Sequence, residues 1–465
     1  MDMITLQLSS DKKQPIYQQL YSYLKAEIQI GRIPFEAKLP SKRKLSAHLG
    51  ISQNTIQAAY DQLMEEGYIL SREKKGFYVC KIDNIQRLEV KQQDLIISSA
   101  NLSRVSYDFT YHGVDMPSFP FEHWRKLMKE VLNEYDTELL TPGDSLGYYR
   151  LRCAISEYLH QSRGVNCNSS QIIISSGTEM LFQTLIQLLD KDCTYGIENP
   201  GYEKLNQLFI GNRAKFCAIK IDNNGMIPSE IGKKNANVLC ITPAHQFPSG
   251  QIMPINRRIQ LLNWANEDKT RYIIEDDYDS EFKYSGKPVP ALQGLSVNEK
   301  VIYMGSLSKS ISPALRVSYM VLPPHLLNRY REKLSYILCP VPILEQKALC
   351  LFIENGSFER HLNKMRTIYK RKRDILVKAL YELNQGIEVI GADAGLHLLL
   401  RIPNGMSEDM LVKSALDHGV KTYGISKYYF DHSCPMKPPT LLLGFAAIPE
   451  REIPEAVRIL QKAWF

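Results

Sequence analysis

Apolar runs of strand length alternate with segments of helix length from about residue 106 onward, and this alternation constrains the fold more than any other feature. The runs include QIIISSG (171–177), ANVLCITP (236–243), RYIIEDD (271–277) and KVIYMGS (300–306). Strands that alternate with helices form a mostly parallel sheet covered by helices. The sequence therefore predicts an α/β body over residues 106–465.

The first 105 residues differ in character from this body. Residues 1–80 hold short amphipathic segments and a basic cluster, whereas residues 81–105 are mostly polar and contain no glycine, proline or aromatic residue. We predict a small α+β domain for residues 1–80 and a linker for residues 81–105.

The composition argues against several other classes of protein. No apolar run approaches the roughly 18 residues of a membrane span. The first residues lack the apolar core of a signal peptide, so we expect a cytoplasmic protein with no membrane partner. The nine cysteines are scattered without a CxxC pair, which indicates reduced thiols and predicts no metal site. The net charge of +7 permits nucleic-acid binding but does not argue for it alone.

The N-terminal domain has the pattern of a helix, a helix-turn-helix and a hairpin. Apolar residues recur at helical spacing over residues 16–28. Ser41 and Ser52 are suited to cap two short helices separated by about three residues. The segment 68–80 has a basic tip and predicts a two-stranded wing.

Polar and basic side chains gather at the start of the second short helix, on the helix before it and on the wing. The second helix of such a pair enters the major groove of DNA with its N-terminal end. Gln and Asn can bond adenine there, Thr can contact a thymine methyl group, and nearby cations meet phosphates. The residues expected to contact double-stranded DNA are Lys42, Arg43, Lys44, Ser52, Gln53, Asn54, Thr55, Arg72, Lys74 and Lys75.

This domain resembles the GntR family of winged-helix regulators over most of residues 15–79. The resemblance rests on PIYQQL, GRIPFEAKLPSKRKLSAHLGISQNTIQAAYDQLMEEGYI and KKGFYV. The family usually has arginine at the position of Gln53 and glutamate at that of Lys42, which leaves the operator sequence open. Arg43 is the residue that the family has.

In the body, the segment after the strand at 300–306 has the chemistry of a site for an aldehyde with a phosphate. Lys309 can form a Schiff base with an aldehyde. Ser306, Ser308 and Arg316 can hold a phosphate. Pyridoxal 5'-phosphate (PLP) offers both groups, so we predict that PLP binds at Lys309.

Other strand ends supply candidate contacts for the same cofactor, because ligands of such sheets bind beyond the carboxyl ends of the strands. Asp276 can face the pyridine nitrogen and Tyr278 the phenolic oxygen. A helix that begins after a small-residue turn can offer backbone N–H groups to a phosphate. The further candidates are Gly177, Thr178 and Glu179 for the phosphate, and Tyr202, His245 and Gln246 for the ring.

In this order, the segments of the body resemble those of the fold-type-I aminotransferases. The whole chain resembles the MocR subfamily of GntR-type regulators, and IIEDDYDSEF, HQFPSGQIMP and YMGSLSKS are most similar to its GABA-responsive member. The resemblance implies a winged helix-turn-helix head and a fold-type-I body with a smaller C-terminal α+β subdomain. It also implies a head-to-tail homodimer with exchanged heads. PLP would be an internal aldimine on Lys309, with Asp276 at N1, Tyr278 at the phenolic oxygen and Arg316 at the phosphate.

The chain departs from an active aminotransferase at the substrate end of the site. An arginine near the C-terminus usually binds the substrate carboxylate, and its place in PTLLLGF (439–445) falls on Leu442. Without that clamp the reacting carbon is poorly oriented. We therefore expect a sensor rather than an enzyme, which leaves room for residual half-transamination.

The GABA-responsive member binds its effector with two arginines, and this chain has Lys204 and Lys427 in their places. Lysine keeps the positive charge but loses the planar fork of arginine. With Arg316, these residues are the candidate effector contacts. They favour a small anionic amine or amino acid, sensed through external aldimine formation at Lys309.

Two alternatives stay open from the sequence. One is an aminotransferase with an accessory DNA-binding head, which steady turnover of an amino donor would favour. The other is a regulator that senses PLP itself, which a cofactor spectrum unchanged by every amine would favour.

Overall fold

The computed structural model describes residues 6, 14–82, 105–133, 137–284, 286, 289–383, 385–430 and 438–465. The chain divides into two compact units, Met1–Ser99 and Ala100–Phe465, which we call the head and the body. Most of the predicted linker lies outside the described residues, so the linker and its boundaries stay predictions. Within the described part of the chain, every helix is too short or too polar to cross a lipid bilayer.

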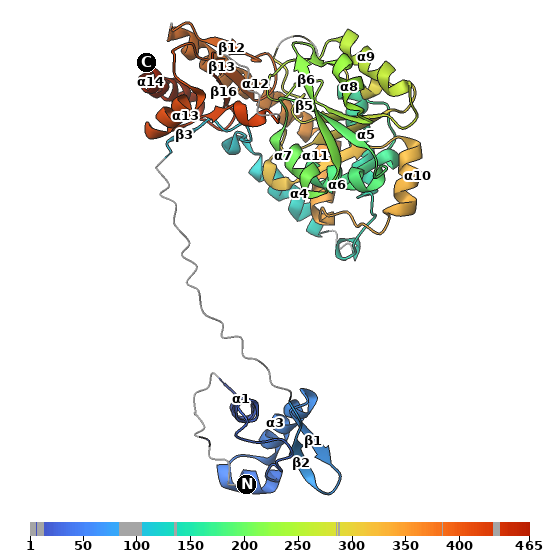
Figure 1. Ribbon diagram of the computed structural model, residues 1–465, viewed down its shortest axis with the longest axis vertical. Helices are drawn as coiled ribbons and strands as arrows, with labels where there is room; N and C mark the ends of the chain where they lie inside the picture. The colour runs from blue at the N-terminus through green and yellow to red at the C-terminus, as the bar shows by residue number, and fades with distance from the viewer. Residues whose placement is uncertain are drawn as a thin grey trace. The chain divides into compact units, whose positions relative to one another are not determined.

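The head has the winged helix-turn-helix arrangement that the sequence predicts (Figure 1). Its described elements are α1 (Ile16–Gln29), α2 (Lys42–Leu49), α3 (Gln53–Glu65), β1 (Ile69–Arg72) and β2 (Gly76–Val79). The two strands pair antiparallel and form the wing. α1 packs on α3 through the buried side chains Leu20, Leu24, Ile28, Ile56, Ala59, Tyr60 and Leu63. Ile16 shares the apolar spacing but is 43% exposed at the first turn of α1.

Serine caps begin both short helices of the head where the sequence predicts them. The Ser41 hydroxyl accepts from the backbone N–H of Lys44 at 3.3 Å, and the Ser52 hydroxyl accepts from the backbone N–H of Thr55 at 3.1 Å. Gly50 takes a left-handed conformation, φ 68°, and ends α2. Caps of this kind stabilise a helix by about 1 kcal/mol each.

The body is built on an eight-stranded sheet. In spatial order its strands are β4 (Ile172–Ser176), β11 (Val317–Val321), β10 (Val301–Ser306), β9 (Tyr272–Asp277), β8 (Val238–Ile241), β5 (Thr194–Asn199), β6 (Lys215–Asp222) and β7 (Gly225–Met226). β11 and β7 run antiparallel to their neighbours, and β10, β9, β8, β5 and β6 pair in parallel. Because β4 and β10 both oppose β11, they point the same way.

Helices cover both faces of this sheet, because successive side chains of a strand point to opposite sides. On β10, Ile302 and Met304 join the core under α6 and α10, and Tyr303 joins the core under α5 and α11. The predicted α/β body is therefore confirmed. The helices are α4 (Phe121–Asn133), α5 (Tyr149–Arg163), α6 (Thr178–Leu188), α7 (Glu203–Gly211), α8 (Pro228–Lys234), α9 (Ile255–Asn266), α10 (Pro324–Lys333) and α11 (Ile343–Glu354).

A smaller subdomain follows and has its own antiparallel sheet and apolar core. Its sheet lies beside α13 and α14 in Figure 1. β3, the first strand of the body, pairs in parallel with β14 of this subdomain. Its elements are β3 (Tyr107–Asp108), α12 (Ser357–Glu382), β12 (Glu388–Ile390), β13 (His397–Arg401), α13 (Glu408–Asp417), β14 (Val420–Lys421), β15 (Tyr423–Gly424), β16 (Thr440–Gly444) and α14 (Ile453–Trp464).

The small subdomain contacts the large one, backbone against backbone, at the loop after β8. A Cβ atom added to Gly250 would lie 2.7 Å from the Cα of Gly391, so neither position has space for a side chain. Nearby, the backbone N–H of Gly395 donates to the carbonyl of Phe282 at 2.8 Å. This joint lies next to the candidate site.

Candidate functional site

The candidate site is a cavity at the edge of the large sheet where its parallel strands end. β4, β5, β8, β9 and β10 all present their carboxyl ends there, which is where open α/β sheets bind ligands. Of the residues that the sequence predicts, the cavity is lined by Gly177, Thr178, Glu179, Tyr202, Lys204, Asp276, Tyr278, Ser306, Ser308, Lys309 and Arg316.

Lys309 reaches into this cavity from the segment that follows β10. Its Nζ donates to the carbonyl of Tyr111 and lies 5.9 Å from the centre of the Tyr111 ring. Burial lowers the pKa of Lys309 to about 8, with Asp279 opposing the shift. A larger fraction of the amine is therefore neutral at physiological pH than for an ordinary lysine, and only the neutral form is a nucleophile.

Asp276 lines the same cavity from the end of β9. Its Oδ1 is buried and has no hydrogen-bond partner among the described residues. Burial, with repulsion from Asp277 and Asp279, raises the pKa of this carboxyl to about 7. A buried carboxylate without a partner is costly, so this position suits a ligand that brings an N–H or a cation.

The turn between β4 and α6 forms the anion end of the cavity. Gly177 has φ 89°, and a Cβ atom there would lie 2.2 Å from Nη2 of Arg316. Arg316 donates to the Glu179 carboxylate at 3.0 Å. A phosphate at the start of α6 would therefore take the place of Glu179 at the guanidinium.

Both lysines predicted to contact an effector already have carboxylate partners. Lys204 lines the cavity and lies 3.8 Å from Glu179. Lys427 does not line the cavity, and its Nζ lies 3.7 Å from Glu203 and 4.8 Å from the centre of the Tyr428 ring. Lys427 therefore lies outside the described lining, and its contact with an effector stays a prediction.

His245 and Gln246 also lie outside the described lining, so their contact with the ring stays a prediction. His245 is buried against Asp279 and Tyr278. Gln246 is buried too, and its side chain donates to the carbonyl of Pro200 at 3.0 Å and accepts from the Ser249 hydroxyl at 2.6 Å. Phe247 and Thr242 of the same segment line the cavity instead. The chain turns after β8, so strand alternation no longer indicates which side chain points inward.

Six lining residues were not predicted from the sequence. They are Tyr111, His112, Thr242, Phe247, Pro313 and Ser318. The Tyr111 and His112 rings lie 3.8 Å apart. Burial, with the charges of Lys309, Lys204 and Lys427, lowers the pKa of His112 to about 4. The aromatic pair shortly after β3 was the feature of the sequence that could have predicted this wall of the cavity.

Leu442 lies on β16, opposite Leu399 on one side and Tyr423 on the other. It is fully buried in an aromatic and aliphatic cluster with Tyr111 and Phe247, two residues of the cavity wall. Leu442, which stands where an aminotransferase usually has its carboxylate-binding arginine, is thus an apolar packing residue.

The head presents the predicted DNA-contacting residues in two groups. Gln53 and Asn54 are exposed at the start of α3, whereas the Ser52 hydroxyl is occupied as a cap. Arg43, Lys44, Lys74 and Lys75 are exposed. Lys42 donates to the side chain of Gln57, and Arg72 lies 3.3 Å from Glu36.

The residues of the cavity fit PLP. Asp276 supplies an unpartnered acceptor for the pyridine nitrogen, and Lys309 supplies an amine of lowered pKa. Gly177 leaves space beside Arg316 that any Cβ would fill. Tyr202 lines the wall and packs edge-on to Phe247, with ring centres 5.9 Å apart.

Comparisons with known proteins give the same division of the chain. Residues 16–79 match the model of bacterial regulatory proteins of the gntR family, and residues 111–460 match aminotransferase class I and II. The uncharacterized HTH-type transcriptional regulator YdeL of Bacillus subtilis (strain 168) is 43% identical over 97% of both chains. The probable rhizopine catabolism regulatory protein MocR of Rhizobium meliloti is 30% identical over 99% of this chain and 96% of its own.

Among solved structures, the kynurenine aminotransferase of Pyrococcus horikoshii in complex with PMP superposes with a TM-score of 0.68. The sequence identity is 25%, and the match covers 77% of this chain and 90% of that enzyme. The body therefore has the fold of the aminotransferases.

Proposed function

Because this chain belongs to the MocR subfamily of GntR-type transcription regulators, we propose that it is a cytoplasmic regulator that binds a DNA operator and senses a small amine through PLP at Lys309. The cofactor is PLP, as the aminotransferase body implies. The observation that carries the proposal is the buried Oδ1 of Asp276, which has no partner among the described residues, in the same cavity as Lys309.

Each end of the cavity has a separate task in this proposal. Asp276 holds a proton on the pyridine nitrogen, and Tyr278 donates to the phenolic oxygen. The backbone N–H groups at the start of α6 bind the phosphate together with Arg316. When bound, PLP supplies an electrophilic carbon that one primary amine at a time can occupy.

The effector amine competes with Lys309 for that carbon. Because burial lowers the pKa of Lys309 to about 8, its free amine would carry less charge in the cavity than an ordinary lysine, and its release would cost less solvation. Freed Lys309 can keep its bond to the carbonyl of Tyr111. Since β3 and Tyr111 lie at the start of the body, the exchange acts next to the strand through which the chain enters it.

The effector in this proposal carries a carboxylate as well as an amine. Lys204 lies on the cavity wall, and Lys427 lies behind it beside Tyr428. Both lysines have carboxylate partners at 3.7–3.8 Å, which are long distances for ion pairs. An effector carboxylate can therefore replace Glu179 or Glu203 without a large cost.

We propose a sensor and not a catalyst because of Leu442. An arginine clamp would have to enter a fully buried apolar cluster that includes the cavity residues Tyr111 and Phe247. A substrate held only by lysines has less fixed orientation at its reacting carbon. At most, slow half-transamination would remain.

A homodimer with exchanged heads completes the proposal. Phe121, Leu140 and Tyr149 are 66%, 88% and 60% exposed. They belong to α4, to the short helix at Thr137–Leu140 and to α5, which all pack on α11. Exposed apolar side chains around one helix are typical of an interface between subunits. Sedimentation equilibrium tests this part, and a monomer at micromolar concentration would contradict it.

The main experiment follows absorbance and DNA binding in the same sample. The full chain is loaded with PLP and titrated with a panel of small amino acids and amines, while a labelled DNA fragment from its own promoter reports binding. We expect one class of anionic amine to change the spectrum and to change DNA affinity at least about tenfold. Lys309→Ala should lose the visible absorbance, whereas Lys215→Ala, at an exposed lysine paired with Asp192, should keep it.

Two results would redirect the proposal. Steady turnover of an amino donor and a 2-oxo acid at ordinary enzyme rates would favour an aminotransferase. A spectrum that no amine changes, with DNA binding that follows the PLP concentration, would favour a sensor of PLP itself.

A further inference from the structure

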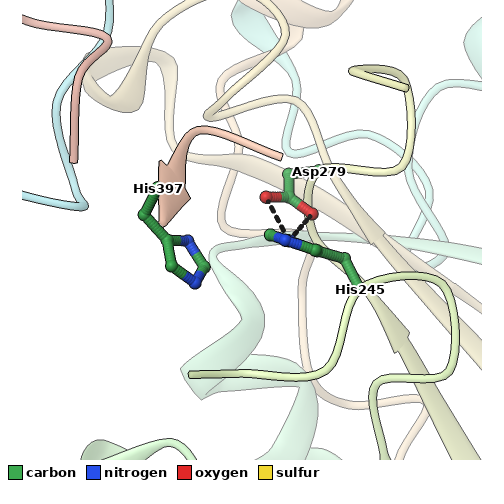
Figure 2. A group of neighbouring side chains, drawn as sticks. All are labelled: His245, Asp279 and His397. Carbon is green, nitrogen blue, oxygen red and sulfur yellow. Dashed lines mark hydrogen bonds and ion pairs between the residues drawn. The ribbon is translucent and has the colours of Figure 1, made fainter. Parts of the chain in front are cut away.

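His245, Asp279 and His397 form a buried cluster (Figure 2). The hydroxyl of Tyr278 contacts Nδ1 of His245 at 3.0 Å. His245 and Asp279 belong to the large subdomain, and His397 begins β13 of the small one. Their ligand atoms lie within 4.8 Å of one another, which raises the question of a metal ion.

Hydrogen bonds account for this cluster better than a metal does. Nδ1 of His245 lies 3.0 and 3.1 Å from the two carboxylate oxygens of Asp279, as Figure 2 shows. Nε2 of His397 lies 3.1 Å from the carbonyl oxygen of Pro248, to which it donates. Gly395 packs against the pair, since a Cβ there would lie 2.0 Å from Cε1 of His245 and 2.5 Å from Oδ2 of Asp279.

The positions of the protons follow from these distances. A carboxylate only accepts, so Nδ1 of His245 carries a proton. The hydroxyl of Tyr278 lies 2.9 Å from the carbonyl oxygen of His245 and 3.0 Å from its Nδ1. This hydroxyl donates its one proton to the carbonyl, so its oxygen accepts from Nδ1–H. One N–H is therefore shared between Asp279 and Tyr278.

We infer that His245 is a positioning residue, oriented by Asp279, whose Nδ1–H holds the oxygen of Tyr278 while PLP binds. With PLP present, the hydroxyl turns its one proton from the carbonyl of His245 to the phenolic oxygen of PLP, and the bond that its oxygen accepts from Nδ1–H makes it a stronger donor there. The inference rests on the proposed function, because it needs PLP beside Tyr278. Tyr278 lines the cavity. A hydroxyl that accepts a hydrogen bond becomes a better donor, because hydrogen bonds in a chain polarise one another.

The environment of His245 supports this role over simple packing. Its Nε2 is buried and has no hydrogen-bond partner among the described residues. All the described polar contacts of the ring are therefore on the Nδ1 side, toward Asp279 and Tyr278. Gly395, with φ 69°, leaves the space that the ring and the carboxylate occupy.

The test is the pH midpoint of the visible absorbance of bound PLP. His245→Leu removes the N–H, so Tyr278 donates less strongly to the phenolic oxygen of PLP. That oxygen then keeps more negative charge, and the proton whose loss changes the visible absorbance is bound more tightly. We expect the midpoint to move up by about half a unit or more. His245→Asn keeps an N–H close to the place of Nδ1 and should restore much of the original value. His397→Gln changes the same cluster without touching Tyr278 and should leave the midpoint unchanged.

A double-mutant cycle separates positioning from a general electrostatic effect. Asp276, Asp277, Asp279 and Glu198 all act on Tyr278 electrostatically. In the Tyr278→Phe background these charges remain, but the hydroxyl is gone, so His245→Leu should cause no further shift. If His245→Leu does not fold, Asp279→Asn takes its place in the same cycle.

Three outcomes would overturn the inference. Equal shifts in both backgrounds would mean that His245 acts without Tyr278. An unchanged midpoint in His245→Leu, with PLP bound and the visible absorbance present, would contradict the role of His245 and leave the proposed function standing. A wild-type protein with no visible absorbance in the presence of PLP would overturn both.

Discussion

Lys309 and Asp276 have shifted pKa values for the same physical reason, which is burial at the end of the sheet. Burial disfavours the charged form, so the pKa of the amine falls to about 8 and that of the carboxyl rises to about 7. A ligand that brings a suitable partner group would therefore stabilise each of them. The amine needs an electrophile, and the carboxylate needs a cation or an N–H donor.

The lowered pKa of Lys309 predicts how PLP capture depends on pH. Only the neutral amine attacks, so the rate at which the apoprotein captures free PLP should rise through a midpoint near pH 8. Stopped-flow absorbance measures this rate. Nα-acetyl-lysine under the same conditions is the control, and its midpoint should lie near that of free lysine, about 10.4. Coincident midpoints would contradict the prediction.

The same shift has a stability consequence of definite sign. Between about pH 8 and the ordinary lysine pKa of 10.5, the unfolded chain binds more protons at this site than the folded apoprotein does. The contribution of Lys309 to the free energy of unfolding therefore increases as pH rises through this window. Urea unfolding at several pH values measures the gain. Lys309→Met should lose that part of the pH dependence, and an identical dependence in both proteins would exclude the site as its source.

Residues with a specific chemical role in the site could be predicted from the sequence, whereas residues that only shape the cavity wall could not. Lys309, Asp276 and Gly177 follow from what PLP requires at each strand end, and all three line the cavity. His245 and Phe247 are two positions apart, and only Phe247 lines it. No periodicity continues through the turn after β8, so the sequence could not choose between them.

At the scale of elements, the turn from β4 into α6 forms the end of the cavity where we expect the phosphate of PLP. Its conformation depends on Gly177, which has both a positive φ and no space for a Cβ. Gly405 also has a positive φ, 82°, but nothing lies within 4 Å of its Cβ position. Substitutions at these two glycines therefore distinguish the effect of backbone strain, which both positions have, from the effect of crowding against Arg316, which only Gly177 has.

This pair gives a matched prediction. Gly177→Ala should weaken PLP binding about tenfold or more, because the methyl group displaces Arg316 and strains the start of α6. Gly405→Ala should cost stability of about 1 kcal/mol and leave PLP affinity unchanged. Equilibrium dialysis measures the affinity, and equal losses in both variants would show that strain alone is responsible.

In the head, α2 and α3 place basic and polar residues at a surface suited to DNA. Lys44→Ala removes an exposed cation at the first turn of α2. We expect the slope of log affinity against log salt to become shallower by about one unit per head. Fluorescence anisotropy over a salt series measures the slope. Lys25→Ala, at a lysine paired with Glu66 at 2.6 Å, is the control and should change the slope little; an equal change would contradict the assignment.

The order of elements could be predicted from the sequence because each depends on local signals. Ser41, Ser52 and Gly50 mark the short helices of the head, and the apolar runs mark the central strands of the body. The pairing of β3 with β14 joins residues more than 300 positions apart and has no local signal. The same holds for Leu442 in the cluster beside Tyr111, which depends on contacts between subdomains.

At the scale of the whole molecule, the chain is two compact units, each with its own apolar core. Separate cores predict separate unfolding transitions. PLP binds in the body, so it should raise only the body's transition, and operator DNA should raise only that of the head. At a hundredfold excess over Kd, the gain is about 2.7 kcal/mol.

Scanning calorimetry tests this with four samples: the protein alone, with PLP, with DNA and with both. Removal of PLP by dialysis should return the body's transition to its original temperature. A single transition that both ligands raise would mean that the two units unfold together.

The pairing of Lys204 with Glu179 and of Lys427 with Glu203 has a consequence for discrimination among metabolites. Under the proposed function, the effector carboxylate would have to displace the counter-ion of Lys204 on the cavity wall, and Lys427 behind that wall has a counter-ion of its own. An anion without an amine, such as chloride, would gain from this exchange at one end only. An anionic amine would gain at both ends, because it would also bind PLP beside Lys309, so a sensor of the proposed kind would discriminate against anions that carry no amine.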